Sequence, residues 1–133
     1  MEDPALAEQL WSGTGLCDAL RGVEVEGAAA VGLNSNIRIY SYSKGQRFGR
    51  HIDESNDVAR PRGRTFYTLL VYLSDPRGGA TIFYDRRGRQ AASVAPRTGL
   101  ALLHLHGDEC MEHEGAAVTG GVKYVLRSDV VFA

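Results

Sequence analysis

The chain is dominated by short runs in which hydrophobic and polar residues alternate, separated by glycine and proline. Such runs cover residues 36–42 ("NIRIYSY"), 65–73 ("TFYTLLVYL") and 122–132 ("VKYVLRSDVVF"). In the first of them Ile37 and Ile39 share one face of a strand, and Arg38, Tyr40 and Tyr42 share the other. Turn sequences such as "DPRGG" and "TGG" lie between the runs. Many short strands with such turns predict a β-sandwich or barrel.

Helical patterns are confined to the start of the chain. Asp3 followed by Pro4 is typical of a helix N-cap with proline in the first turn, and Leu6 and Leu10 would share one helix face. A second short helix is expected over Leu16–Leu20. We therefore expect a single domain over 1–133, with short helical support in residues 1–28 and a mainly β core in residues 29–133.

Composition limits the classes of function. The 133 residues carry a net charge of −1, so no strong field draws the protein to nucleic acid or to a membrane. Two cysteines are too few for a disulfide framework and fit a reducing compartment. The acidic start "MEDPALAEQL" does not resemble a signal peptide, and no run approaches the ~20 apolar residues of a membrane span. An intracellular, cytoplasmic protein is expected.

The first candidate for chemistry is "GRHIDES", residues 49–55. On a strand His51 and Asp53 point the same way, and an imidazole with a carboxylate suits a divalent first-row metal. The third ligand would come from the remaining histidines, which are His104, His106 and His113. Two histidines and one carboxylate with open positions form the facial set of non-haem Fe(II) oxygenases.

A lysine helps to choose among these histidines. Lys123 follows His113 by ten residues, and a hairpin turn at 119–121 would place the two side by side. The ammonium would then meet the far carboxylate of a dicarboxylate that chelates the metal. Such a pair is strong in a low-dielectric interior.

With these residues in place, the sequence resembles the Fe(II)- and 2-oxoglutarate-dependent dioxygenases of the prolyl 4-hydroxylase-like branch. The resemblance covers Leu33 to Phe132 and rests on "YSKGQRFGRHID", "YTLLVYLS", "GGATIF", "VAPRTGLALL" and "HEGAAVTGGVKYVLRSDV", in that order. It implies a mainly β fold, the double-stranded β-helix or jelly roll, with short N-terminal helices. It also implies Fe(II), 2-oxoglutarate and O2 as cofactor and co-substrates, with ascorbate as reductant.

The resemblance also assigns residue roles. Iron would be held by His51, Asp53 and His113, and Lys123 would bind the C5 carboxylate of 2-oxoglutarate. Tyr42 matches a tyrosine that approaches the co-substrate in relatives, and Tyr72 matches one that helps to hold its far carboxylate. Arg127 departs from the usual pattern: it shares a strand face with Lys123, and it could share the anchor role, pair with Asp129 or meet the substrate.

Plainer interpretations accompany several residues. His104 and His106 could be spare metal ligands, but neutral, hydrogen-bonded histidines lining the barrel are favoured. Cys110 is expected to be a buried structural thiol and not a ligand. The segment Glu54–Arg64 is expected to be irregular and exposed, and Arg60, Arg62 and Arg64 to be solvated.

Three functions compete. The first is an oxygenase that hydroxylates a C–H bond, with peptidyl proline as the substrate class that the branch suggests; its partner is a protein, a peptide or a small molecule. The second is a non-catalytic, cupin-like jelly roll that binds zinc or manganese. The third is a nucleic-acid demethylase on the same scaffold. The near-neutral charge and a lysine at the anchor, where an arginine would be expected, count against the third.

Overall fold

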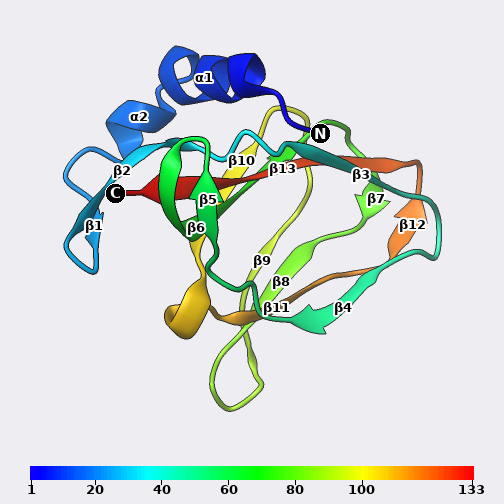
Figure 1. The fold of residues 1–133 in the computed structure, drawn as a ribbon. Coiled ribbons are helices and arrows are strands. Elements are labelled where there is room, and N and C mark those ends of the chain that lie inside the picture. Colours follow the sequence, from blue (N-terminus) through cyan, green and yellow to red (C-terminus); the bar gives the residue numbers. More distant parts are fainter.

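Strands are the predominant elements of the molecule, and the two helices lie at its N-terminus (Figure 1). The computed structural model describes residues 1–133. The longer of the two helices has ten residues, and no helix has the length and apolar character needed to cross a bilayer. In chain order the elements are α1 Pro4–Gly13, α2 Leu16–Ala19, β1 Glu24–Val25, β2 Ala28–Leu33, β3 Arg38–Tyr42, β4 Phe48–His51, β5 Asp57–Ala59, β6 Arg62–Tyr72, β7 Arg77–Gly78, β8 Thr81–Tyr84, β9 Gln90–Val94, β10 Ala101–Leu105, a 3-10 turn Gly107–Glu109, β11 Glu112–Gly115, β12 Val118–Gly120 and β13 Lys123–Phe132.

The strands form two main antiparallel sheets. The larger runs β1-β2-β13-β6-β10, with β3 added beside β13 and β5 beside β6. The smaller runs β4-β11-β8-β9, and β12 and β7 form a separate pair. In Figure 1 the larger sheet lies between the helices and the smaller sheet. The predicted mainly β, jelly-roll-like fold with short N-terminal helices is confirmed.

The helices cover the outer face of the larger sheet. Asp3 caps α1 as predicted, since its carboxylate accepts a hydrogen bond from the backbone N–H of Leu6 at 2.9 Å. Ala7 and Trp11 on α1 are buried in one apolar cluster that continues into the strands. The remaining buried members of that cluster are Leu20, Leu33, Ile37, Phe66, Leu69, Leu126, Val130 and Phe132.

Strand β13 separates this apolar core from a polar interior. Leu126 and Val130 point toward the helices and join the core, whereas Lys123, Val125 and Arg127 line a cavity on the opposite face. Alternation along a strand places these two sets on opposite faces of the sheet. The functional site therefore lies on the inner face of the larger sheet.

One local expectation is wrong. Residues 54–64 are not wholly irregular, because β5 pairs with the start of β6 and so places Arg62 and Arg64 on a strand. Ile39 is 58% exposed, although Ile37 is buried. Tyr40 and Tyr42 line the cavity from the face of β3 opposite to Ile37 and Ile39.

Candidate metal centre and co-substrate cavity

His51 and His113 face each other directly across neighbouring strands of the smaller sheet. They are register partners in β4 and β11, and their ring centroids lie 4.3 Å apart. Each ring has its Nδ1 against a backbone carbonyl oxygen, that of Gly49 at 2.7 Å and that of Met111 at 2.8 Å. Because a carbonyl only accepts, Nδ1 carries a hydrogen in each ring, so the lone pair of the neutral imidazole is on Nε2.

Both Nε2 atoms lie close to the carboxylate of Asp53. Asp53 lies just beyond β4 and is buried, with His51 Nε2 and His113 Nε2 each 3.5 Å from one of its carboxylate oxygens. Burial alone would raise the pKa of this carboxyl. The hydrogen bond to His113, the charge of Arg127 and the hydroxyl of Thr68 together hold its pKa well below the ordinary value. Asp53 is therefore ionised at neutral pH.

The three residues fit a divalent metal. Their ligand atoms all lie within 4.8 Å of one another. Two neutral imidazole nitrogens and one carboxylate oxygen form the donor set that non-haem Fe(II) prefers, and the cavity leaves room for further ligands. Whether they bind iron stays a prediction.

The protonation of the two histidines differs in the metal-free site. Burial lowers the pKa of His51. Burial is the largest single effect on His113 and disfavours its charged form, but hydrogen bonds to Asp53, Cys110 and the Met111 carbonyl, with the charge of Asp53, together outweigh it and raise the pKa of His113 to about 10. A metal ion and a proton therefore compete for Nε2 of His113.

Lys123 lies in the same cavity, whose volume is about 160 Å³. Its side chain is buried, and with no anion beside it burial lowers the pKa of Lys123 to about 8. The ammonium nitrogen lies 5.3 Å from the ring centroid of Tyr42 and 5.9 Å from that of Tyr72. A buried ammonium without a counter-ion is suited to bind the carboxylate of a ligand.

Lys123 does not lie in the predicted hairpin with His113. Strand β13 pairs with β3, β2 and β6 in the larger sheet, whereas β11, which carries His113, belongs to the smaller sheet. The residues between them form β12, which pairs with β7. Lys123 therefore faces His113 from the opposite sheet. Gly115 leaves space for it, since a Cβ at Gly115 would lie 3.6 Å from the Lys123 nitrogen.

The two tyrosines relate to this cavity differently. Tyr42 lines it, while Tyr72 is fully buried and shares a hydrogen bond of 2.6 Å with the hydroxyl of Thr81. Thr81 also lines the cavity. Sequence reasoning missed both Thr81 and Thr68; the only available signal was their place within strand-like runs.

Arg127 takes one of the three roles considered for it. Its guanidinium lies 3.4 Å from an oxygen of Asp129 and 3.5 Å from an oxygen of Asp53. Both contacts are at the metal end of the cavity. Arg127 pairs with Asp129 and adds positive charge beside the carboxylate of Asp53, and nothing in these contacts supports a share in the anchor role.

His106 behaves as predicted. The Thr68 hydroxyl donates to Asp53 at 2.8 Å and accepts from His106 Nδ1 at 2.9 Å, and His106 Nε2 accepts from Thr65 at 3.0 Å. Burial lowers the pKa of His106, so the ring is neutral and joins a hydrogen-bonded chain that supports Asp53.

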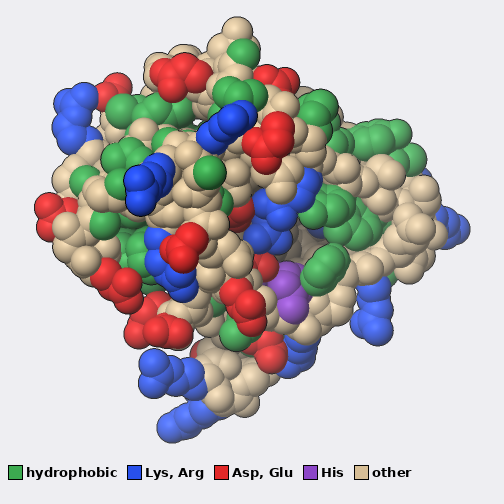
Figure 2. Space-filling model, in the orientation of Figure 1, with side chains coloured by type: hydrophobic (Ala, Val, Ile, Leu, Met, Phe, Trp, Pro, Cys, Tyr) green, Lys and Arg blue, Asp and Glu red, His purple; other side chains and the backbone are tan.

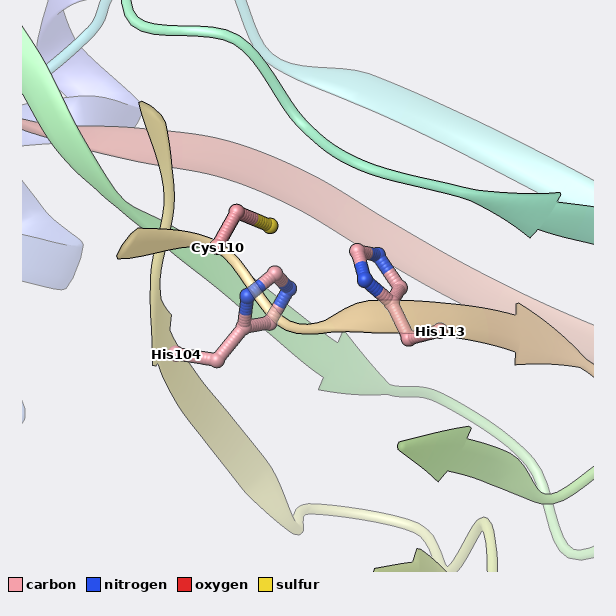
Figure 3. Close-up of side chains that lie close together, drawn as sticks. All are labelled: His104, Cys110 and His113. Carbon is pink, nitrogen blue, oxygen red and sulfur yellow. The ribbon is translucent and has the colours of Figure 1, made fainter. Parts of the chain in front are cut away.

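His104 is neutral and lines the cavity as expected, because burial lowers its pKa to about 4, and its Nδ1 bonds to the backbone carbonyl of Leu105 at 3.3 Å. His104 Nε2 is buried without a hydrogen-bond partner and lies 3.5 Å from a carboxylate oxygen of Asp53. Cys110 is half-buried, and its sulfur accepts a hydrogen bond from the backbone N–H of Asp53 at 3.3 Å. It is thus not the buried structural thiol that the sequence predicted. Both side chains approach His113 (Figure 3).

Two larger hollows adjoin this region, with volumes of about 760 and 750 Å³. They share four lining residues, Ile52, Asp108, Glu109 and Cys110, of which Ile52 directly precedes Asp53 in the chain. Figure 2 shows a hollowed area with a histidine side chain at its edge and basic side chains above it.

Comparison with known proteins agrees with this geometry. The profile of the 2OG-Fe(II) oxygenase superfamily matches residues 37–128. The chain is similar to a Pseudomonas putida prolyl-4-hydroxylase (21% identity, TM-score 0.66, 97% of this chain and 70% of that one). It is also similar to the viral collagen prolyl hydroxylase of Paramecium Bursaria Chlorella virus-1 (18% identity, TM-score 0.66, 97% and 70%).

A third similar structure is the Trichoplax adhaerens prolyl hydroxylase in complex with a hypoxia inducible factor peptide fragment. Its identity to this chain is 19% and the TM-score is 0.67, with coverage of 93% of this chain and 55% of that one. No curated protein sequence matches the chain. The likeness to these solved structures concerns the fold, and the profile match concerns the family.

Proposed function

The chain belongs to the 2OG-Fe(II) oxygenase superfamily and is a 2-oxoglutarate-dependent dioxygenase, and from this premise we propose which of its residues carry the reaction. His51, Asp53 and His113 hold Fe(II), and Lys123 binds the C5 carboxylate of 2-oxoglutarate. The observation that carries the proposal is the single cavity that has the three metal-binding side chains at one end and a buried, unpaired ammonium beside them.

Each residue has a defined task in this proposal. The backbone carbonyls behind His51 and His113 keep both Nε2 atoms directed at Asp53. Thr68 and Arg127 keep Asp53 ionised and fixed. Iron at this position supplies the redox chemistry that couples conversion of 2-oxoglutarate and O2 to succinate and CO2 with hydroxylation of a C–H bond.

The co-substrate is oriented by the opposite end of the cavity. Lys123 neutralises its far carboxylate, and Thr81, held by Tyr72, donates a hydrogen bond to it. Tyr42 lines the cavity wall beside the ammonium. The low dielectric that depresses the pKa of Lys123 also strengthens its pairing with a carboxylate.

For the prime substrate we propose a proline-containing peptide. The support is the similarity to prolyl hydroxylases, one of which holds a peptide. The two hollows beside Asp53 suit an extended chain better than a small molecule. Ile52 and Met111, which are 56% and 41% exposed, offer apolar contacts there. We also propose ascorbate as the reductant. A reducing, cytoplasmic location completes the proposal and is supported by the two unpaired cysteines.

Anaerobic titration tests the site directly. Addition of Fe(II) and 2-oxoglutarate to the protein should produce the visible metal-to-ligand charge-transfer band of a chelated 2-oxo acid. His51→Ala and His113→Ala should abolish the band. Lys123→Ala should retain it only at much higher 2-oxoglutarate concentration, whereas Lys44→Ala, which changes the other lysine of the chain, should match wild type.

Turnover separates this proposal from a non-catalytic, metal-binding jelly roll. Succinate formation with O2 should require Lys123, and addition of ascorbate should prolong it. A proline-containing peptide library should show products with the mass of one added oxygen atom. Full succinate formation by Lys123→Ala, or by either histidine variant, would remove that residue from the site.

A further inference from the structure

A second set of metal-binding side chains overlaps the iron site. We propose that His104, Cys110 and His113 form a sulfur-containing site that binds zinc and excludes iron. The Nε2 or Nδ1 atoms of the histidines and the cysteine sulfur lie within 4.8 Å of one another. The three residues come from β10, from the segment after the 3-10 turn and from β11, and their side chains converge on one space (Figure 3).

The side chain of His104 has a nitrogen that is free to bind a metal ion. This side chain is 10% exposed, and its Nε2 is buried without a hydrogen-bond partner. Its Nδ1 faces the backbone carbonyl of Leu105 at 3.3 Å, which leaves the lone pair on Nε2. An unpartnered buried nitrogen costs free energy unless something binds it. Its ring centroid lies 4.6 Å from that of His113, so one ion can reach both rings.

Cys110 supplies the feature that distinguishes this set from the iron triad. Its sulfur accepts the backbone N–H of Asp53 at 3.3 Å, and a thiolate would be stabilised by that bond. The side chain lies at the edge of both large hollows, which gives an ion access from solvent. On binding, the thiol releases its proton to solvent and the sulfur ligates as thiolate. Zinc accepts mixed nitrogen and sulfur ligands, whereas non-haem Fe(II) oxygenase sites use nitrogen and oxygen.

Asp53 can complete the coordination. One of its carboxylate oxygens lies 3.5 Å from Nε2 of both His104 and His113. Ligands about 2 Å from zinc at tetrahedral angles lie roughly 3.3 Å apart, so this spacing suits a four-coordinate ion. Such a site is closed and leaves no position for 2-oxoglutarate. Because Asp53 and His113 also belong to the iron triad, zinc and iron exclude each other.

Cobalt substitution tests the sulfur ligand without any catalytic assay. Co(II) added to the metal-free full chain should give an intense thiolate-to-cobalt charge-transfer absorption in the near ultraviolet. Cys110→Ser should lose this absorption. Cys17→Ser, a matched change at the exposed cysteine, and His51→Ala, which removes an iron ligand outside this set, should both keep it.

Zinc affinity gives the second readout. In competition with a chromogenic zinc chelator, Cys110→Ser should weaken zinc binding at least about tenfold, and Cys17→Ser should not change it. The Fe(II)–2-oxoglutarate band should persist in Cys110→Ser and disappear from wild type when zinc is added first. Absence of the thiolate absorption in wild type, or unchanged zinc affinity in Cys110→Ser, would overturn the zinc site. Neither of these two results would contradict the proposed iron site, because the Fe(II)–2-oxoglutarate band tests that site separately.

Discussion

Lys123→Met should make the protein more stable while removing its co-substrate. Burial depresses the pKa of Lys123 from 10.5 to about 8, and one pKa unit corresponds to about 1.4 kcal/mol, so holding the ammonium in the empty cavity costs about 3 kcal/mol. Methionine fills the space without charge. It forfeits the contacts of the ammonium with Tyr42 and Tyr72, at 5.3 and 5.9 Å, which contribute about 0.5–1 kcal/mol each. A net gain of about 1–2 kcal/mol remains at pH 7.

The stability that Lys123→Met gains over wild type depends on pH. Below pH 8 Lys123 is charged in the folded and unfolded states, so wild type bears the full cost. Between pH 8 and 10.5 the folded state loses its proton first, and the wild-type free energy of unfolding rises relative to the variant. Above pH 10.5 the residue is neutral in both states. The advantage of Lys123→Met should therefore shrink through this window and become smallest at its upper end.

Urea unfolding of the metal-free chain at pH 7, 9 and 10.5 measures this difference. Lys44→Met is the matched control, since Lys44 is exposed and its change should stay within about 0.5 kcal/mol. With a divalent metal and 2-oxoglutarate at 100 times the dissociation constant, wild type should gain about 2.7 kcal/mol and Lys123→Met much less. A variant no more stable than wild type at pH 7, or a gain that does not change with pH, would refute the assignment of an unpaired buried ammonium.

Two further substitutions test the support of the site. Thr68→Val removes the hydroxyl that donates to Asp53 at 2.8 Å. It should lower the free energy of unfolding in urea by about 1–3 kcal/mol and weaken Mn(II) binding, measured by titration, about 10–100-fold. Unchanged stability and unchanged Mn(II) binding would contradict the supporting role of Thr68. Gly115→Ala places a methyl group 3.6 Å from the Lys123 nitrogen; it should leave the fold intact but raise the 2-oxoglutarate concentration needed for the charge-transfer band. Gly49→Ala, which meets nothing within 4 Å, is its control, and equal behaviour of the two would show that space at Gly115 does not matter.

Local patterns predicted the parts of the site that depend on neighbouring residues. The His-x-Asp spacing placed His51 and Asp53 together, and the Asp3-Pro4 pair placed the start of α1. Alternation along 122–132 placed Lys123 and Arg127 on the same face. These inferences needed only the geometry of a single strand or helix turn.

Relations between distant strands were beyond such patterns. A turn at 119–121 is compatible with a hairpin, but several strands compete to pair with β13, and in the fold it pairs with β6 and β2, where Leu126, Val130 and Phe132 join the apolar core. Which sheet a strand joins depends on that competition across the whole chain. The roles of Thr68 and His104 likewise depend on their register, in which they are direct partners on β6 and β10. Nothing in either residue type indicates that it faces Asp53.

The imidazoles of the proposed iron triad are oriented by main-chain oxygens at positions 49 and 111. A peptide carbonyl is present whatever amino acid occupies those positions. The alignment of the two rings is therefore encoded by the path of the backbone, and the amino acids at 49 and 111 can change without loss of that alignment. Evolution, or a designer, can accordingly reshape the rim at Met111 to admit new substrates while the catalytic machinery beneath stays in place.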